Sequence, residues 1–410
     1  MSGLYRDRRF YFILTANILS SIGSGITMIA IPWLLVSTPS GASTFGYVAI
    51  VMTMISFLIA PSIGHIVDKY SRKRILLLAE LMGLVVILFF ALIGFTGVEY
   101  QGWHYMILYG IGTLYYTLFY PAIFAFNQEI FDPSTYRALN GAMEIQGQLS
   151  SMLAGAIAAI LISKVDLQWL LFFDALTYLC GLLLFIRIPY EQTANVEQRG
   201  GAFFKKLKEG IHYMKTKPSL FFFLMASIMP FIGVMLTNYL FPIHLNSVLK
   251  VDAGVYGMQS MLYGVGAVLA GVVIPMLAAK RGNMAIIIST VFLYTVGITW
   301  ISFVESVPIY LILTMLLAFG NAGTRVARNS YMMDEIPNQL IGRVDSLFRT
   351  IGLGLRIVLL AVFTKLAGNG DIQIAFYILF SFMILSVGVV ICSKMALNKK
   401  AITYVRNTAQ

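Results

Sequence analysis

One arginine, Arg356, lies deep inside a long apolar run, where an ionised side chain is costly and is by default a functional candidate. It follows Arg343, which marks the start of that run, by 13 residues. At 1.5 Å per residue a helix would carry it about 20 Å inward, near the middle of a ~30 Å hydrocarbon layer. We expect Arg356 to bind an anionic substrate, or alternatively to be neutralised by a fixed carboxylate that locks two helices together. Arg325 and Arg328, near the end of the preceding run, are expected to anchor the membrane interface or to extend a positive path toward Arg356.

Acidic residues in other apolar runs could exchange protons. Glu144 lies a few residues from the end of its run, and Asp174 lies deeper. We expect one of these two to carry a coupled proton; the alternatives are an interface salt bridge for Glu144 and a helix-packing role for Asp174. Glu80 lies two turns after the basic cluster Arg72–Arg74, so we expect it to brace that cluster.

Uncharged polar and aromatic residues could line a cavity beside these groups. Tyr115 and Tyr116 lie in the middle of an aromatic-rich run, where they are expected to face water and bind substrate. Gln148 and Asn238 are expected to extend the polar lining. None of the four histidines is expected to take part in coupling.

The elements that must position these residues are membrane helices. Of the 410 residues, 59% are hydrophobic and only 11% are charged, and the mean hydropathy is +0.81. A soluble domain carries about 25% charged residues, so a soluble enzyme with a membrane tail is excluded. Twelve transmembrane helices of about 20 residues need about 240 apolar residues, close to what the chain supplies.

The apolar runs predict twelve such helices. The predicted spans are Phe10–Val36, Thr44–Val67, Ile75–Phe95, Trp103–Phe126, Gly141–Ile162, Gln168–Ile188, Leu220–Ile243, Gly254–Ala279, Met284–Phe303, Pro308–Tyr331, Val344–Leu366 and Ile372–Cys392.

Basic residues gather on one side of these spans. The loops after the odd-numbered spans, taken together with the end of the eleventh span, hold only Lys164, Lys250 and Lys365 of the 29 Lys and Arg. The opposite loops and tails hold nearly all the others, so the positive-inside rule predicts that both termini are cytoplasmic. The net charge of +11 therefore needs no nucleic-acid partner.

The long hydrophilic segment Pro189–Pro218 falls in the middle of the chain. We expect its basic second half to form an amphipathic helix on the anionic inner leaflet, or alternatively to act as a regulatory strap. Asp132-Pro133 and Ile336-Pro337 recur 204 residues apart, about half the chain. Two six-helix repeats of this kind are typical of transporters with a midplane site. The predicted divisions are a first bundle (1–188), a linker (189–218), a second bundle (219–393) and a tail (394–410).

The loop between the second and third spans carries the sharpest motif. It contains Gly64, Asp68, Arg72, Lys73 and Arg74 at the spacing G-x-x-x-D-x-x-x-R-K-R. A glycine at this place lets two helices approach closely. The motif resembles the signature of the major facilitator superfamily, which implies an all-α membrane fold with twelve helices in two six-helix bundles. The resemblance also implies that these five residues form a gate that latches the two halves in the outward-facing state.

Further segments resemble the drug and siderophore exporter branch of that superfamily, which includes macrolide efflux pumps and the enterobactin exporter. They are Pro121-Ala122, Pro133 to Asn140, Pro337 to Val344 and Asp174 to Tyr178. Asn17 in the first span also resembles that branch and is expected to bind substrate.

Two features depart from that branch. Ala154-Gly155 stands where antiporters commonly carry a Gly-Pro pair, and the fourth span has no arginine.

We therefore expect a proton-coupled secondary transporter, not an enzyme. It would export a small amphiphilic anion such as a siderophore or other metallophore by alternating access. The alternatives are a broad drug or macrolide antiporter, uptake of a nutrient anion, and a sensor or lipid scramblase.

The sequence has no metal-ligand spacing, nucleotide loop or nucleophile elbow, so we expect no cofactor and no bound metal. Cys180 and Cys392 fall in apolar runs, so no disulfide is expected. The expected partners are the substrate, protons and membrane lipids. The expected form is a monomer in a bacterial cytoplasmic membrane.

Overall fold

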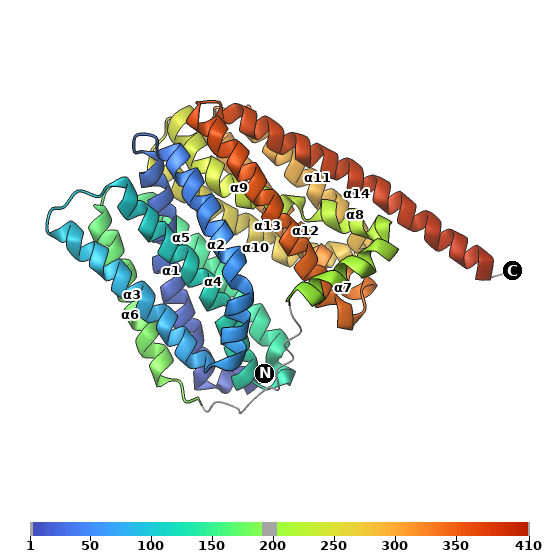
Figure 1. Cartoon of the computed structure of the whole chain (residues 1–410), viewed down its shortest axis with the longest axis horizontal. Helices are drawn as coiled ribbons and strands as arrows, with labels where there is room; N and C mark the ends of the chain where they lie inside the picture. The colour runs from blue at the N-terminus through green and yellow to red at the C-terminus, as the bar shows by residue number, and fades with distance from the viewer. Residues whose placement is uncertain (1–2, 191–202, 409–410) are drawn as a thin grey trace. The chain divides into compact units, whose positions relative to one another are not determined.

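The computed structural model describes residues 3–190 and 203–408, and within these ranges some side chains, including those of Asp68 and of residues 203–206 and 398–408, lie outside the description. In this part of the chain every regular element is a helix (Figure 1). The α-helices are α1 (Arg8–Val36), α2 (Gly41–Lys69), α3 (Arg72–Phe95), α4 (Gly102–Ile130), α5 (Tyr136–Leu161), α6 (Leu167–Arg187), α7 (Phe203–Thr216), α8 (Pro218–Ser227), α9 (Met229–Ile243), α10 (Ala253–Arg281), α11 (Asn283–Ile301), α12 (Val307–Glu335), α13 (Asn338–Gly368) and α14 (Ile372–Thr408). Short helical turns are η1 (Gly3–Arg6), η2 (Pro133–Thr135) and the π-turn η3 (His244–Val248).

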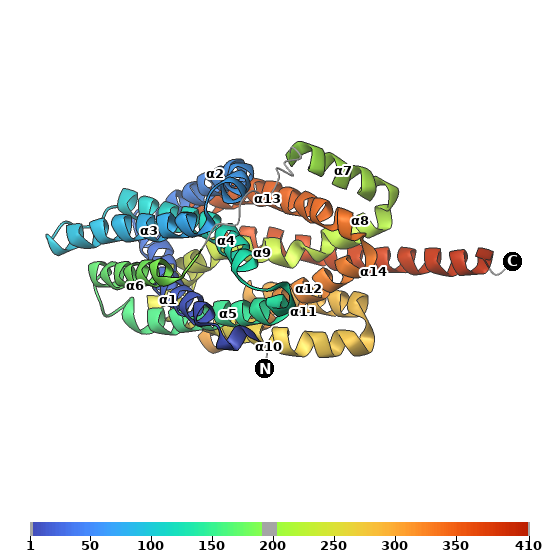
Figure 2. The ribbon, with the colours of Figure 1, turned by 90° about the horizontal axis from the view of Figure 1, so that it is seen from below.

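Helices cover all twelve predicted spans, which confirms the all-α membrane fold. Among the described residues, eleven helices are long and apolar enough to cross a membrane, with Pro218–Val248 counted as one. The twelfth is α5, which has 26 residues but carries Glu144, Gln146 and Gln148 in its first half and is therefore less apolar. The amphipathic helix expected in the linker also forms, as α7, and it runs beside α13 (Figure 2).

The seventh span is broken after Ser227 because Pro230 follows. A proline has no N–H to donate to the carbonyl four residues earlier, and that carbonyl belongs to Ala226. Ser386 of α14 supplies the missing donor, with its hydroxyl 2.7 Å from the Ala226 oxygen. Broken membrane helices are tolerated where side chains satisfy the freed backbone groups in this way.

The chain forms two compact units. Unit 1 comprises α1 to α6 together with Phe241–Gly264, and unit 2 comprises α7 to Leu240 together with the chain from Val265 onward. The exact domain boundaries predicted from the sequence stay predictions.

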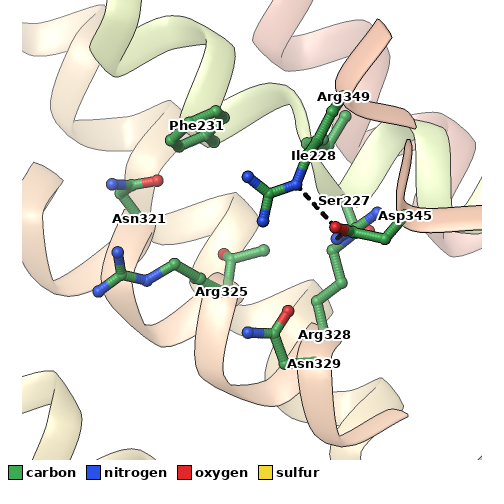
Figure 3. A pocket seen from close by; sticks show the side chains of 10 residues that line it. Ser227, Ile228, Phe231, Asn321, Arg325, Arg328, Asn329, Asp345 and Arg349 are labelled. Atoms are coloured by element: carbon green, nitrogen blue, oxygen red, sulfur yellow. Dashed lines mark hydrogen bonds and ion pairs between the residues drawn. The ribbon is translucent and has the colours of Figure 1, made fainter. Parts of the chain in front are cut away.

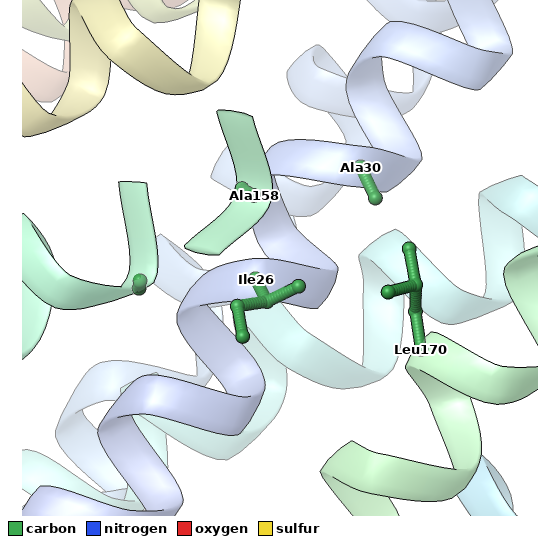
Figure 4. Packing of buried hydrophobic residues seen from close by; sticks show 5 residues of the cluster. Ile26, Ala30, Ala158 and Leu170 are labelled. Carbon is green, nitrogen blue, oxygen red and sulfur yellow. The ribbon is translucent and has the colours of Figure 1, made fainter. Parts of the chain in front are cut away.

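The core of unit 1 includes a cluster of small and branched residues where α1, α5 and α6 meet. Its buried members are Ile26, Ala30, Ala154, Ala158 and Leu170 (Figure 4). Alanines at these positions let the helix backbones come close, which is how membrane helices gain van der Waals contact in the absence of a hydrophobic driving force.

Still within unit 1, the start of α10 packs closely against α5. A Cβ added at Gly257 would collide with the backbone of Ala159, and one added at Gly155 would meet the backbone nitrogen of Met261 at 2.5 Å. Beside them the rings of Trp33 and Tyr256 stack, with their centroids 6.1 Å apart. The glycines are therefore required for the close approach of these two helices.

We predict that Gly257→Val lowers the melting temperature of the purified protein, because overpacking of this kind costs about 1–3 kcal/mol. Gly271→Val on the same helix is the matched control, since nothing lies within 4 Å of its added Cβ. Thermal unfolding in detergent, followed by circular dichroism, compares the two. Equal melting temperatures would contradict the close packing of α5 on α10.

Candidate functional site

A buried carboxylate, Glu80 of α3, lies in the interior of unit 1. It is 0% exposed. The hydroxyl of Ser20 on α1 donates to its Oε2 at 3.0 Å, and the hydroxyl of Tyr115 on α4 donates to its Oε1 at 3.0 Å. Three helices therefore converge on one acidic group.

A second carboxylate, Asp174 of α6, lies near it and is 1% exposed. The hydroxyl of Thr27 on α1 donates to its Oδ2 at 2.6 Å, and the hydroxyl of Thr177 lies 3.4 Å from its Oδ1. Asp174 and Glu80 are close enough to interact electrostatically. We call Ser20, Thr27, Glu80, Tyr115, Asp174 and Thr177 the carboxylate cluster.

The spacing of the hydroxyl residues along α1 and two glycines determine where the side chains of the carboxylate cluster lie. Ser20, Ser24 and Thr27 recur at intervals of four and three residues, so they share one face of α1. α3 and α6 lie side by side in both views (Figures 1 and 2). A Cβ at Gly181 of α6 would crowd Ser20 and Glu80, and one at Gly23 of α1 would crowd Thr177 and Asp174. The absent side chains make room for the two acidic groups.

The partners that the structure gives to the two carboxylates are hydroxyl groups. Among the residues that the structure describes, neither Glu80 nor Asp174 forms an ion pair with a basic side chain; their partners are hydroxyl groups. A buried carboxylate that lacks a cation is expensive in its ionised form. Taking up a proton removes this cost, so the arrangement can bind and release protons.

Tyrosines extend from the cluster toward Glu144. The hydroxyls of Ser24 and Tyr116 are 2.6 Å apart, and the rings of Tyr116 and Tyr120 stack with centroids 5.4 Å apart. Tyr120 interacts electrostatically with Glu144, which is exposed and accepts a 3.1 Å hydrogen bond from Gln148. The predicted residues Tyr115, Tyr116, Gln148, Glu144 and Asp174 thus all belong to unit 1.

Asn17, also predicted to bind substrate, is buried in unit 1. Its Nδ2 lies 3.7 Å from the sulfur of Met143, and Nδ2 of Asn127 lies 3.4 Å from the same sulfur. The Oδ1 atoms of both asparagines are buried and have no hydrogen-bond partner among the described residues. Each of these two amide oxygens can therefore accept a further hydrogen bond where α1, α4 and α5 meet.

Two predicted binding residues lie in unit 2. Arg356 is half-buried on α13, one turn after Gly352, which faces Ile232 of α9. Asn238 is exposed on α9. Their joint use with the residues of unit 1 stays a prediction.

The basic loop ties three helices of unit 1 together at one end. Arg72 pairs with Glu129 of α4 at 3.1 Å, and Lys73 donates to the carbonyls of Ile186 and Ile188 at 2.9 and 2.7 Å. The last carbonyls of a helix lack partners within it, so Lys73 satisfies the end of α6.

Tyr190 donates to Glu129 at 2.7 Å. Burial, and then this hydrogen bond to the carboxylate, raises the pKa of Tyr190 to about 12, so it stays a donor at neutral pH. Glu129 of α4 thus pairs with Arg72 and also accepts the hydrogen bond from Tyr190.

One expectation about this loop needs correction. Glu80 does not brace Arg72–Arg74; it lies in the carboxylate cluster, because Ser20 and Tyr115 hold it there. Nothing among the described residues of unit 1 lies within 4 Å of a Cβ built at Gly64, and its role in the gate stays a prediction. Arg74 is exposed, and Asp68 lies outside the description of side chains.

Sequence reasoning missed Glu80 as a partner of Asp174. The signal that could have found it is the row of hydroxyl residues on α1, since Ser20 and Thr27 each face one carboxylate. Such a row in an apolar helix indicates acceptors on the neighbouring helices.

Comparison with known proteins agrees with this architecture. Residues 13–359 match the family model described as Major Facilitator Superfamily. Macrolide efflux protein A of Streptococcus pyogenes is 20% identical over 373 residues, which cover 88% of this chain and 90% of that protein. Macrolide efflux protein A of Enterococcus faecalis is 21% identical over 311 residues, which cover 73% and 95%.

Solved structures share the fold at low sequence identity. The nucleoside transporter NupG superimposes with a TM-score of 0.69 at 13% identity, covering 93% of this chain and 98% of that one. A bacterial homologue of the iron transporter ferroportin, in its inward-facing state, gives a TM-score of 0.68 at 15% identity and covers 94% and 98%. With its family match across most of the chain and its many membrane-spanning helices, this multi-pass membrane protein belongs to the Major Facilitator Superfamily of transporters.

Proposed function

We propose that this transporter exports a small amphiphilic anion, such as a siderophore or another metallophore, in exchange for protons. Transport would follow alternating access, with the substrate bound near the midplane between the two halves. Both termini would be cytoplasmic, as the distribution of Lys and Arg predicts. The Asp68 loop would gate the cytoplasmic side.

The carboxylate cluster is the observation that carries proton coupling. Glu80 and Asp174 are both buried, both held by hydroxyls and, within the described part of the chain, both without a basic partner. Acidic residues inside membrane bundles commonly form proton relays. Each would accept a proton when its surroundings are dry and release it when a conformational change admits water. Glu144, which is exposed, would exchange protons with the cytoplasmic solution.

Arg356 supports the anionic class of substrate. A guanidinium group in the middle of a membrane span favours a carboxylate or phosphate, which it can bind through two parallel hydrogen bonds. Tyr115, Tyr116, Gln148, Asn17 and Asn238 would complete the binding surface.

Drug or macrolide efflux is the second candidate, and the relatives favour it. The curated relatives from Streptococcus pyogenes and Enterococcus faecalis are both named macrolide efflux proteins. For such substrates the acidic groups Glu144 and Asp174 would attract a cation, and Arg356 would have a structural role.

Removing the titratable groups should uncouple transport from the pH gradient. We predict that Glu80→Gln and Asp174→Asn each reduce substrate-driven proton release by about tenfold or more, which corresponds to a transport barrier that is higher by at least ~1.4 kcal/mol. Both replacements keep the side-chain shape and remove the ability to ionise. Proteoliposomes with an acidic interior and a quenched pH dye measure the release when substrate is added.

Glu99→Gln is the matched control, because Glu99 is exposed in the loop between α3 and α4. Exchange of substrate without a gradient should persist in all three variants, which shows that they are folded. Proton release at the wild-type rate in both Glu80→Gln and Asp174→Asn would contradict proton coupling through the cluster.

The substrate class rests on Arg356. Anionic chelators of the citrate type, macrolides and lipophilic cations are added one at a time to the same vesicles. We predict a response to the chelators that Arg356→Ala lowers about tenfold and Arg356→Lys lowers less, because a lysine keeps the charge without the two-pronged geometry. A response to macrolides or cations alone, unchanged by Arg356→Ala, would move the assignment to drug efflux.

A further inference from the structure

Unit 2 contains a cavity of about 210 Å³ bordered by the break between α8 and α9 and by parts of α12 and α13 (Figure 3). Its charged and amide side chains are Arg325, Arg328, Arg349, Asp345, Asn321 and Asn329, and we call it the arginine cavity. Figure 3 shows the side chains of Arg325, Arg349 and Asn321 around the same open space.

The side chain of Arg328 is buried, and only some of its hydrogen-bond donors have an acceptor. It is 6% exposed, and its guanidinium stacks over the ring of Phe348 at 5.3 Å. Its Nη1 lies 3.9 Å from Oδ1 of Asp345. Its Nε and Nη2 are buried and have no hydrogen-bond partner among the described residues. A buried charged donor that lacks an acceptor is costly, so a ligand oxygen beside these two atoms would stabilise Arg328.

The charges around the cavity are unequal. Asp345 is the one carboxylate among the described lining residues, and it is already shared. Nε of Arg349 donates to its Oδ2 at 2.7 Å, while Arg328 lies beside its other oxygen. Two guanidinium groups, those of Arg328 and Arg349, thus share a single carboxylate, and an anion would balance the positive charge that remains.

The depth of the cavity makes this excess significant. Arg328 lies seven residues before the end of α12, and Arg349 lies eleven residues after the start of α13. At 1.5 Å per residue these positions are about 10 and 16 Å from the turn that joins the two helices. An arginine this far along a membrane helix usually pairs with an acidic side chain, a backbone carbonyl or a ligand.

We propose that the arginine cavity binds an anionic group with several acceptor oxygens, a phosphate or a carboxylate. Such a group matches the planar fork of arginine, and the free donors of Arg328 would bind it directly. Drug-sized ligands occupy pockets of about 300–1,000 Å³, so a cavity of about 210 Å³ suits a small ion or a headgroup rather than a whole drug.

The proposal does not depend on the transported substrate. The anion could be free in solution, or it could be the headgroup of an anionic lipid from the inner leaflet, which basic residues near the membrane attract. The chemistry at the cavity is the same for both sources, and the experiment separates them.

Binding is measured directly on the purified full chain. Inorganic phosphate and citrate are titrated in detergent by calorimetry and by thermal unfolding, with sodium chloride of equal ionic strength as the salt control. In parallel, native mass spectrometry counts lipids retained from nanodiscs of phosphatidylglycerol or phosphatidylcholine. We expect saturable binding of phosphate or citrate if the source is a free anion, and retained phosphatidylglycerol alone if it is a lipid.

The arginine variants decide between a site and general attraction to a basic protein. Arg328→Gln should weaken binding about tenfold or more, because hydrogen bonds to charged groups are the strong ones. Arg325→Gln and Arg349→Gln, whose residues are exposed, should each weaken it several-fold and serve if Arg328→Gln does not fold. Arg187→Gln, at the exposed end of α6, is the matched control and should bind like the wild type. Absence of binding by every probe, or equal binding by the cavity variants and the wild type, would overturn the proposal.

Discussion

Two acidic side chains buried in a membrane bundle, with hydroxyls as their partners, are the constraint on which unit 1 depends. Glu80 and Asp174 must each receive hydrogen bonds from neighbouring helices, since water is excluded and, in the described part of the chain, no basic side chain pairs with them. This requirement fixes the rotation of α1, whose hydroxyl face must point at α3 and α6. It also explains Gly23 and Gly181, because any larger residue would displace the carboxylates or their donors.

Positive charge plays different roles in different parts of the chain. In unit 1, Arg72 is paired with Glu129 and Lys73 donates to the carbonyls at the end of α6, so both residues join helices. In unit 2, Arg328 retains buried donors without an acceptor in the described residues. These side chains carry the same charge but differ in whether their hydrogen-bond donors have acceptors. Arg72 and Lys73 join helices, whereas the donors of Arg328 remain available to a ligand.

Much of the fold follows from the sequence because apolar run length and loop charge are strong signals. All twelve predicted spans are helical, and their ends agree within a few residues, apart from the longer α14. Side-chain partners were harder to predict. Glu80 was expected to brace a loop only two helical turns away, yet its donors come from Ser20 and Tyr115, on helices that sequence distance does not relate to it. Likewise, Leu220–Ile243 was predicted as one span, and the donor from Ser386 that satisfies the backbone at its break depends on the packing of α14.

The central claim is that Glu80 and Asp174 carry exchangeable protons. Infrared difference spectroscopy of the reconstituted protein tests it directly, because protonated carboxylic acids have a C=O stretching band of their own. We expect a band from buried carboxylic acids that weakens when substrate binds and that Glu80→Gln and Asp174→Asn each reduce. A spectrum without such a band, or one that both variants leave unchanged, would contradict the account.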